Sequence, residues 1–388
     1  MRIFVLGAGA TGGLLAQLLE RQGHLVWCGD REPERARRFL GPKIECLPAN
    51  ARNLRAVVRA GRNCHLLINA APATFNETVI RAALRLRAHY LDMASHLNRY
   101  AFKAEQLRYD RRFREKRRLA LINAGVAPGL TNLLVARSAD QLDQVEQVRI
   151  RLFEETESED PISTWSADTA FDEAVSRPRI YRQGRFRPAP RFSEPEKFRF
   201  PPPIGQTRVV LAAQDEVGTL PHFISMKELD VKIGGNEIDR LRRWYRQGKL
   251  RPSAKRVIKR FPRTPSPRQV AQLIRRGILH NARFAVAVVV TGSKNGEPLE
   301  LRCSCVFPSL YQLRQKGFLA TPIAYVTAHT AAAFVKYLPR QLWGVYPPEA
   351  LPASTRKIIL AELRHRGFQF FLQTIKLKPA EEEETEEL

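Results

Sequence analysis

The chain opens with Met1-Arg-Ile-Phe-Val-Leu-Gly7-Ala-Gly9-Ala10-Thr11-Gly12-Gly13. A short apolar run stops at glycines in the spacing Gly-x-Gly-x-x-Gly, and leucines then recur at helical intervals over residues 14–19. This order predicts a strand, a tight turn and a helix. In such a unit the first glycine permits the turn, the second lets the backbone approach a pyrophosphate, and the third lets the helix pack on the strand. The stretch therefore predicts a dinucleotide-binding turn, in which the cofactor is contacted by Gly7, Gly9, Ala10, Thr11 and Gly12.

A second predicted strand, at residues 24–28, leads directly to Asp30 and Arg31. A carboxylate at the tip of this strand accepts hydrogen bonds from the ribose 2′-hydroxyl and repels a 2′-phosphate, so Asp30 favours NAD. Arg31 beside it leaves NADP open as the alternative cofactor. Asp30 has a second possible role, as the N-cap of a helix predicted at 32–40, and one carboxylate can serve both.

Strands and helices continue to alternate to about residue 125. Further strands are predicted at 44–47, 65–69, 90–93 and 119–123, separated by helices at 51–60, 74–88 and 99–118. Six strands with crossover helices make a doubly wound parallel sheet of the Rossmann type, whose ligand lies across the carboxyl ends of the strands. The loops after the fourth, fifth and sixth strands therefore supply the remaining predicted cofactor contacts. These are Asn69, Ala70, Pro72, Asp92, Ala127 and Pro128.

The pattern changes after the sixth strand. Apolar Val148, Ile150 and Leu152 alternate with two arginines, which indicates a half-exposed strand in a mixed or antiparallel sheet. Residues 185–205 are rich in proline and arginine, so we expect no regular structure there, and either a lid-like excursion or a plain connector. The predicted fold class is α/β, with an N-terminal Rossmann sheet and a second, α+β domain.

Six motifs carry a resemblance to a known family. They are GAGATGG (7–13), NAAPATFNETVIRAAL (69–84), HYLDMASH (89–96), GVAPGLTNLL (125–134), TLPHF (219–223) and GVYPPEAL (344–351). In this combination the chain resembles the saccharopine dehydrogenase-like oxidoreductases, which include saccharopine reductases and lysine 6-dehydrogenases. The resemblance implies a Rossmann domain, then a domain that carries most of the substrate pocket, and C-terminal elements that pack back toward the first domain.

Four segments are expected on these grounds. Residues 1–125 form the Rossmann domain and residues 126–340 the substrate-binding α+β domain. Residues 341–378 form a C-terminal helix and strand that pack back toward the Rossmann domain. Residues 379–388 form an acidic tail, which self-repulsion of its glutamates keeps disordered.

The resemblance implies NAD(P)-dependent hydride transfer at a CH–NH bond of an amino acid or an amine-linked diacid. Such a reaction needs a group that takes the ammonium proton, and Asp92 and His96 are the candidates because surroundings can shift both pKa values to a useful pH. Their alternatives are a helix N-cap for Asp92 and a surface position for His96. Ser95 and Asn123, in the same loops, are expected near the hydride. The alternative function is a regulatory or interaction protein that binds a dinucleotide without turnover.

Three further residues are implied to border the substrate by the resemblance alone. Trp165 stands where saccharopine reductase-like sequences place a tryptophan before a helix, and its alternative is a core position. Thr219 and His222 belong to the TLPHF motif, whose neighbourhood faces the substrate in the family. An amino-acid-like small molecule is the expected substrate.

The composition of the chain argues against several other classes of protein. The formal net charge is +25, but the densest basic run, at 108–118, includes Asp110 and Glu115, so it is typical of a solvated helix face. Since no nucleic-acid motif with interleaved aromatics occurs, nucleic acid is not an expected partner. The five cysteines form no CxxC pair, so neither a disulfide framework nor a metal site is expected. No apolar run is long enough to span a bilayer, and we expect a cytoplasmic homodimer.

Overall fold

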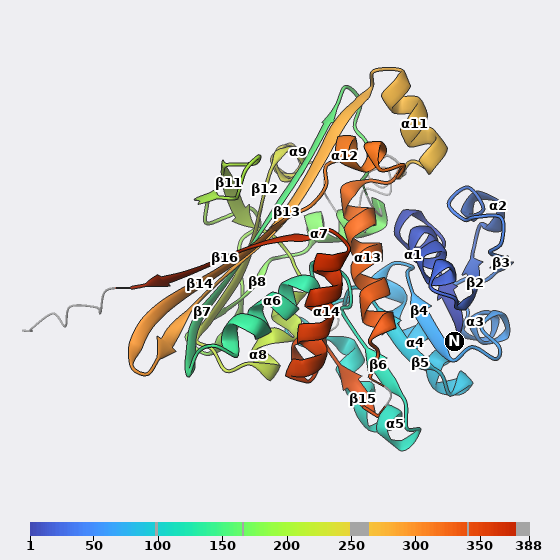
Figure 1. The fold of residues 1–388 in the computed structure, drawn as a ribbon, viewed down its shortest axis with the longest axis horizontal. Helices are drawn as coiled ribbons and strands as arrows, with labels where there is room; N and C mark the ends of the chain where they lie inside the picture. The colour runs from blue at the N-terminus through green and yellow to red at the C-terminus, as the bar shows by residue number, and fades with distance from the viewer. Residues whose placement is uncertain (98–99, 165–166, 249–263, 340, 378–388) are drawn as a thin grey trace, which may run out of the picture.

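The computed structural model describes residues 1–97, 100–164, 167–248, 264–339 and 341–377 (Figure 1). Its described part contains two β-sheets with helices packed around and between them. Trp165 and the acidic tail lie outside the described residues. None of the described helices is long and apolar enough to cross a membrane.

The first sheet has seven strands in the order β15-β6-β5-β4-β1-β2-β3, and all of its pairs are parallel. The strands are β1 (Arg2–Leu6), β2 (Leu25–Asp30), β3 (Cys46–Pro48), β4 (Leu66–Asn69), β5 (His89–Asp92), β6 (Leu119–Leu121) and β15 (Gly344–Tyr346). From β1 the chain winds outward through β2 to β3, and it then returns to β4 on the other side of β1 and winds outward in the opposite direction. This reversal confirms the predicted doubly wound sheet. The seventh strand, β15, was not predicted, because it comes from the far end of the chain and follows no crossover helix.

Both faces of this sheet are buried, which explains the uninterrupted apolar sequence of β1. Ile3 and Val5 point to one face, where they pack with α1 (Ala10–Arg21) and α13 (Pro322–Lys336). Phe4 and Leu6 point to the other, where they pack with α3 (Leu54–Ala60), α4 (Asn76–Leu86) and α5 (Asp110–Glu115). The alternation is the period of two that a strand requires.

The helix predicted at 99–118 is shorter and less regular than expected. Helical structure is confined to a 3₁₀ turn, η2 (Glu105–Tyr109), and the short α5, and residues 100–104 and 116–118 are turns or loop. Glu105 and Gln106 are buried, and their side chains bond to the loop after β5. These polar contacts hold the segment against the sheet, so it does not continue as one amphipathic helix.

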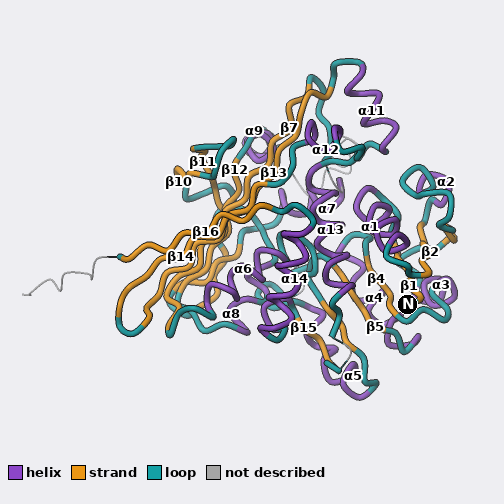
Figure 2. The backbone as a smooth tube through the Cα atoms, in the orientation of Figure 1, coloured by secondary structure: helices purple, strands orange, loops and turns teal. Residues whose placement is uncertain are grey.

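The second sheet is mixed, which confirms the predicted class of this part. Among its described strands only β12 and β7 pair in parallel, and the main path runs β10-β11-β12-β7-β13-β14-β16. The strands are β7 (Gln144–Ser158), β8 (Arg179–Arg182), β9 (Arg185–Pro188), β10 (Glu196–Arg199), β11 (Gln206–Leu211), β12 (Glu228–Gly234), β13 (Leu279–Lys294), β14 (Glu297–Val306) and β16 (Gln369–Lys376). Figure 2 shows the long strands β7, β13 and β14 running side by side.

Three expectations for this second sheet need correction. Residues 185–205 contain two regular strands, β9 and β10, because the prolines fall at strand ends and in the links between strands. Arg151 is 1 % exposed, since Asp230 and Glu196 pair with its guanidinium inside the sheet. Of the C-terminal segment at 341–378, β15 does join the first sheet, whereas the last strand, β16, pairs with β14 at the edge of the second sheet.

The two sheets are joined through helices. In Figure 1, α13 lies between the second sheet and α1, and it contacts both α1 and β13. The helix α14 (Ala353–His365) packs on α13 and on α6 (Leu130–Ala139). One apolar core therefore runs from Ile3 in the first sheet to Val288 in the second. This arrangement brings the carboxyl ends of the Rossmann strands against the second sheet.

Candidate active site

The glycine turn has the geometry that a bound pyrophosphate needs. Gly7 has φ +93°, and a Cβ there would lie 2.6 Å from the Ala71 nitrogen. A Cβ on Gly12 would lie 2.0 Å from the Gly7 carbonyl oxygen, so α1 packs on the turn only with glycine at this position. A Cβ on Gly9 would meet nothing within 4 Å, and no side chain caps the start of α1. The turn thus leaves open space beside helix N–H groups that bind anions.

A cavity of about 980 Å³ begins at this turn and extends to the second sheet. Every residue predicted to contact the cofactor lines it. These residues are Gly7, Gly9, Ala10, Thr11, Gly12, Asp30, Arg31, Asn69, Ala70, Pro72, Asp92, Ala127 and Pro128. They come from separate strand ends of the first sheet, so the topology alone brings them to one edge.

Asp30 is held beside the glycine turn, at one end of this cavity, by the backbone. Its Oδ2 accepts a hydrogen bond from the Ala8 N–H at 2.9 Å and its Oδ1 one from the Glu32 N–H at 2.9 Å. The N-cap of α2 (Pro33–Ala36) is Glu32, so the alternative N-cap role of Asp30 is wrong, although Asp30 does bond to that residue. Arg35 and Arg52, which follow β2 and β3 in the chain, also line the cavity and bring positive charge to it.

Asp92 ends β5 and is buried at the other end of the predicted cofactor path. Its Oδ1 accepts a hydrogen bond from the Asn123 N–H at 2.8 Å, and its Oδ2 accepts one from Gln106 Nε2 at 2.9 Å. Burial raises the pKa of the Asp92 carboxyl to about 7, and these two hydrogen bonds only partly oppose the shift. A carboxyl that titrates near neutrality at the wall of a cavity can take and return a proton.

Ser95 and Asn123 lie behind Asp92 and do not line the cavity. The Ser95 hydroxyl donates to Asn123 Oδ1 at 2.8 Å, and the Ser95 N–H donates to Asp215 Oδ2 at 3.1 Å. Because the backbone of Asn123 bonds directly to Asp92, these contacts fix the position of the carboxylate. The structure thus places both residues in support of Asp92, whereas the sequence had predicted contact with the substrate.

The structure does not bring His96 to the cavity. The imidazole ring faces Asp172, with Nδ1 3.8 Å from Oδ2. The backbone N–H of His96 donates to the Glu105 carboxylate at 3.0 Å. Burial, the largest influence, lowers the pKa of His96. Asp92 is therefore the better placed of the two candidates for proton transfer.

Thr219 and His222 are also separated from the cavity lining. Thr219 is buried, and its Oγ1 accepts a hydrogen bond from Asn132 Nδ2 at 3.3 Å. His222 is exposed, with Nε2 2.8 Å from the Phe102 carbonyl oxygen and its ring stacked on Phe186. Trp165, the third substrate residue implied by the resemblance, lies outside the described residues.

The second sheet supplies a wall that sequence reasoning missed. Its polar members include Glu154 on β7, Gln214 and Asp215 in the loop after β11, and Glu173 on the neighbouring helix α7 (Ala167–Val175). Asp215 lies one residue before Glu216 in the neighbourhood of the TLPHF motif, so that acidic pair was the available signal. No sequence signal marked Glu154 or Glu173, since each lies in a segment whose packing neighbours are distant in sequence. Among the described residues, no group of three His, Cys, Asp or Glu side chains is placed to hold a metal ion.

A buried polar network beside this wall joins the start of α6 to Glu216 and Glu349. Thr131 Oγ1 donates to Glu216 Oε1 at 2.8 Å, and Asn132 Nδ2 donates to Glu349 Oε2 at 3.0 Å. Within the described residues, the second carboxylate oxygen of each glutamate has no partner. Burial raises the pKa of both Glu216 and Glu349 to about 7. The network therefore makes folding sensitive to pH.

We expect Glu349→Gln to flatten the dependence of stability on pH. The folded state retains a proton on Glu349 that the unfolded chain releases at its ordinary pKa of about 4.5, so stability falls as pH rises from about 4.5 to 7. Between pH 5.5 and pH 8 this loss is on the order of 2 kcal/mol for one such group. Urea unfolding at the two pH values measures it. Glu297→Gln, at an exposed position of β14, should retain the wild-type slope, and an unchanged slope in Glu349→Gln would contradict the expectation.

Comparison with known proteins agrees with this geometry. Residues 3–121 match the family model described as the saccharopine dehydrogenase NADP binding domain. Among solved structures, the fold is similar to that of apo saccharopine dehydrogenase (L-Glu forming) from Saccharomyces cerevisiae, with a TM-score of 0.70 and 11% identity over 96% of this chain and 99% of that chain. The DAP dehydrogenase of C. glutamicum in complex with DAP matches with a TM-score of 0.46 and 11% identity, over 92% and 95% of the two chains. Residues 3–121 are thus similar to the NADP binding domain of saccharopine dehydrogenases, and the chain as a whole is similar in fold to saccharopine dehydrogenase.

Proposed function

We propose that the protein is an NAD(P)-dependent oxidoreductase that transfers a hydride at the CH–NH bond of an amino acid or a related amine. The observation that carries this proposal is the single cavity that joins the glycine turn, the buried Asp92 and the acidic wall of the second sheet. A dinucleotide held at the turn extends along the strand ends toward Asp92. The substrate then occupies the side of the cavity formed by the second sheet.

The chain itself contributes positioning and proton transfer. The residues of the glycine turn fit the pyrophosphate, and the nicotinamide, when bound, supplies the hydride acceptor or donor. With its pKa near 7, the deprotonated Asp92 accepts a proton from the substrate ammonium, which leaves a neutral amine able to lose hydride. Water then hydrolyses the imine product. The pair formed by Gln106 and Asn123 holds the Asp92 carboxylate toward the cavity during these steps.

Two measurements test the proposal together. We expect NADH or NADPH to bind in a fluorescence titration, and reduced cofactor to form when the protein is incubated with amine substrates and the oxidised cofactor. Absence of nucleotide binding would overturn the proposal. Binding without turnover across amino acids, diamines and amine-linked diacids would instead support a dinucleotide-binding regulatory protein.

Asp30 predicts a preference for NAD, whereas Arg31, Arg35 and Arg52 favour a 2′-phosphate in the same cavity. We expect Asp30→Asn to improve binding of NADPH relative to NADH by roughly tenfold, because about 1.4 kcal/mol of charge repulsion is removed. Asparagine retains an acceptor for the Ala8 N–H, so the turn should persist. Arg52→Gln should shift the ratio of dissociation constants the other way.

The control for these variants is Arg55→Gln, an exposed position of α3 that does not line the cavity. It should leave both dissociation constants unchanged. If Asp30→Asn leaves the ratio of the two constants at its wild-type value, Asp30 does not set the cofactor preference.

A further inference from the structure

Three buried polar side chains form a chain of hydrogen bonds beside the cavity. Glu105 Oε1 accepts a hydrogen bond from Asn76 Nδ2 at 2.9 Å, and Asn76 Oδ1 accepts one from Asn69 Nδ2 at 2.8 Å. Asn69 and Asn76 line the cavity, whereas Glu105 does not. Because all three side chains are buried, the loss of one bond leaves a polar group without water to replace its partner.

Glu105 sets the direction of this chain of hydrogen bonds. Asn76 Nδ2 donates both to Glu105 and to the Ala94 carbonyl oxygen, the latter at 2.8 Å. Since a carbonyl oxygen can only accept, the nitrogen of the Asn76 amide must face this side and its oxygen must face Asn69. The Asn69 amide is then oriented as well, with Nδ2 toward Asn76 and Oδ1 accepting the Ala71 N–H at 3.1 Å. Glu105 therefore fixes two side chains of the predicted cofactor path.

Glu105 also holds the loop after β5. The backbone N–H of His96 lies 3.0 Å from both oxygens of its carboxyl group. The next residue, Gln106, donates from Nε2 to Asp92 Oδ2 at 2.9 Å. Two consecutive side chains of η2 thus bind the far end of this loop and the carboxylate with which it begins. Through the hydrogen bonds of Glu105, η2 ties the loop after β4 to the loop after β5.

The contacts of Glu105 do not depend on a negative charge. Burial raises the pKa of its carboxyl to about 8, and hydrogen bonds from Asn76, from its own backbone N–H and from the His96 N–H only partly oppose the shift. At neutral pH most molecules therefore hold a proton on this carboxyl, and its carbonyl oxygen remains an acceptor. Length and an acceptor oxygen are the properties that the position requires.

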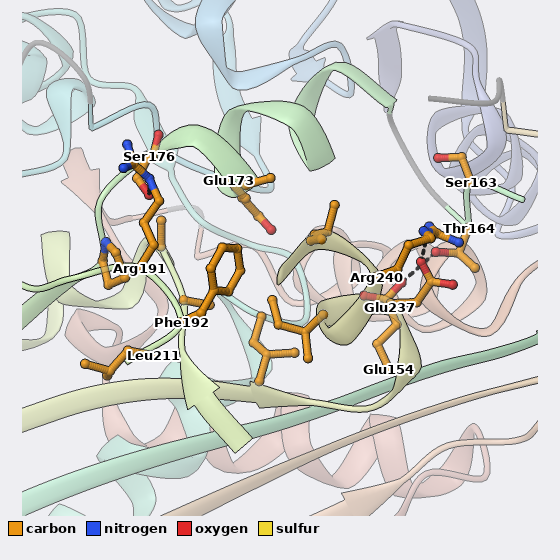
Figure 3. Close-up of a pocket in the computed structure, with 17 residues that line it drawn as sticks. Glu154, Ser163, Thr164, Glu173, Ser176, Arg191, Phe192, Leu211, Glu237 and Arg240 are labelled. Atoms are coloured by element: carbon orange, nitrogen blue, oxygen red, sulfur yellow. Dashed lines mark hydrogen bonds and ion pairs between the residues drawn. The ribbon is translucent and has the colours of Figure 1, made fainter. Parts of the chain in front are cut away.

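The side of the cavity formed by the second sheet takes no residue from this chain of hydrogen bonds. Glu154 and Glu173 lie on that side, and both also line a smaller chamber beside α7 (Figure 3). The described lining of this chamber comes entirely from residues 154–241. A substitution of Glu105 should therefore act on the cofactor side of the cavity and leave the opposite side intact.

Building on the proposed function, we infer that Glu105 is a positioning residue for the nicotinamide end of the dinucleotide. Its bonds to Asn76 and to the His96 N–H hold the loops after β4 and β5 in the one arrangement in which the dinucleotide can pass Asn69 and end opposite Asp92. Glu105 touches neither cofactor nor substrate, and it acts only through these two loops.

The test compares Glu105→Gln with Glu105→Asp in fluorescence titrations of the full chain with NADH at pH 7. Glutamine retains the length and one acceptor oxygen. Aspartate retains the carboxyl group but is shorter by one methylene, so it cannot reach Asn76 and His96 together. We expect the dissociation constant to stay within about threefold of wild type in Glu105→Gln and to rise roughly tenfold in Glu105→Asp, the scale of one lost buried hydrogen bond. Wild-type affinity in Glu105→Asp with weakened binding in Glu105→Gln would assign the effect to charge and overturn the inference.

Hydrogen exchange of the free protein, followed by mass spectrometry, reports on the two loops themselves. In Glu105→Asp and Glu105→Ala, exchange should accelerate roughly tenfold at residues 69–76 and 93–97, where the Ala71 and His96 N–H groups lose their fixed partners, and should stay at the wild-type rate in β7. Glu115→Ala, at an exposed position of α5, should match wild type throughout. If Glu105→Ala does not fold, Glu105→Asp and Glu105→Gln carry the comparison.

Steady-state kinetics separate positioning from a loss of folded protein. Glu105→Asp should raise KM for NAD and lower kcat, while KM for the amine stays within about twofold and Glu105→Gln restores both values. Wild-type exchange in both loops of Glu105→Asp would overturn the inference, even if turnover of an amine supports the proposed function. Exchange and NADH affinity require no turnover, so they decide the role of Glu105 even if the protein oxidises no amine.

Discussion

Asp92→Asn is expected to lower kcat for amine oxidation by at least 100-fold, the usual scale for loss of a positioned acid or base. Asparagine has nearly the same shape, and its carbonyl oxygen can still accept the hydrogen bond from the Asn123 N–H. It cannot take a proton from the substrate. Steady-state assays should therefore show a large fall in kcat, while the dissociation constant for NADH changes little.

The pH profile separates proton transfer from a merely structural effect. Burial raises the pKa of Asp92 to about 7, so wild-type oxidation should rise with pH as this carboxyl loses its proton. The variant should lack that rise. Asp143→Asn serves as the control, because Asp143 accepts a hydrogen bond from the Asn295 N–H far from the cavity. A profile in Asp92→Asn with the wild-type rise near pH 7 would assign the proton transfer to another group.

Gly12→Ala is expected to damage both folding and nucleotide binding. Its Cβ would lie 2.0 Å from the Gly7 carbonyl oxygen and 2.8 Å from the Ala70 Cβ, so backbone must move to admit it. Overpacking of this kind costs about 1–3 kcal/mol. We expect that loss in urea unfolding, together with at least tenfold weaker binding of NADH, because the displaced turn no longer presents its N–H groups.

Gly9→Ala distinguishes the two effects. Its Cβ meets nothing within 4 Å in the protein alone, so stability should be unchanged, but the added methyl group would occupy space proposed for the pyrophosphate. Binding of NADH should weaken. Gly41→Ala is the control for both variants, since its nearest neighbour would be 3.9 Å away. Wild-type affinity for NADH in Gly9→Ala would show that the pyrophosphate lies elsewhere.

The first sheet could be predicted because its information is local. A β-strand followed by a glycine turn and a helix is encoded within about thirty residues, and the crossover rule then orders successive units. The cavity lining from Gly7 to Pro128 follows from the same rule, since each predicted contact lies directly after a strand. The strand β15 escaped prediction because it joins the sheet from residue 344 onward, after all but the last strand of the second sheet.

The candidate site was less predictable beyond the cofactor path. Ser95 and Asn123 occur in the predicted loops, yet their side chains bond to each other behind Asp92 rather than entering the cavity. His96 follows Asp92 by four residues but faces Asp172 on α7. Sequence spacing identifies a loop, whereas the direction of each side chain depends on neighbours contributed by distant segments.

The sequence by itself determined the parallel sheet, the glycine turn and the set of residues at its strand ends, since local periodicity and chain connectivity encode all three. Only the tertiary structure decided what faces that edge. Glu154 and Glu173 lie on a strand and a helix that become neighbours through long-range pairing and packing, and Glu216 and Glu349 meet the helix α6 from opposite ends of the second half of the chain. Such contacts are energetically strong only after burial has removed water, and burial is a property of the assembled fold.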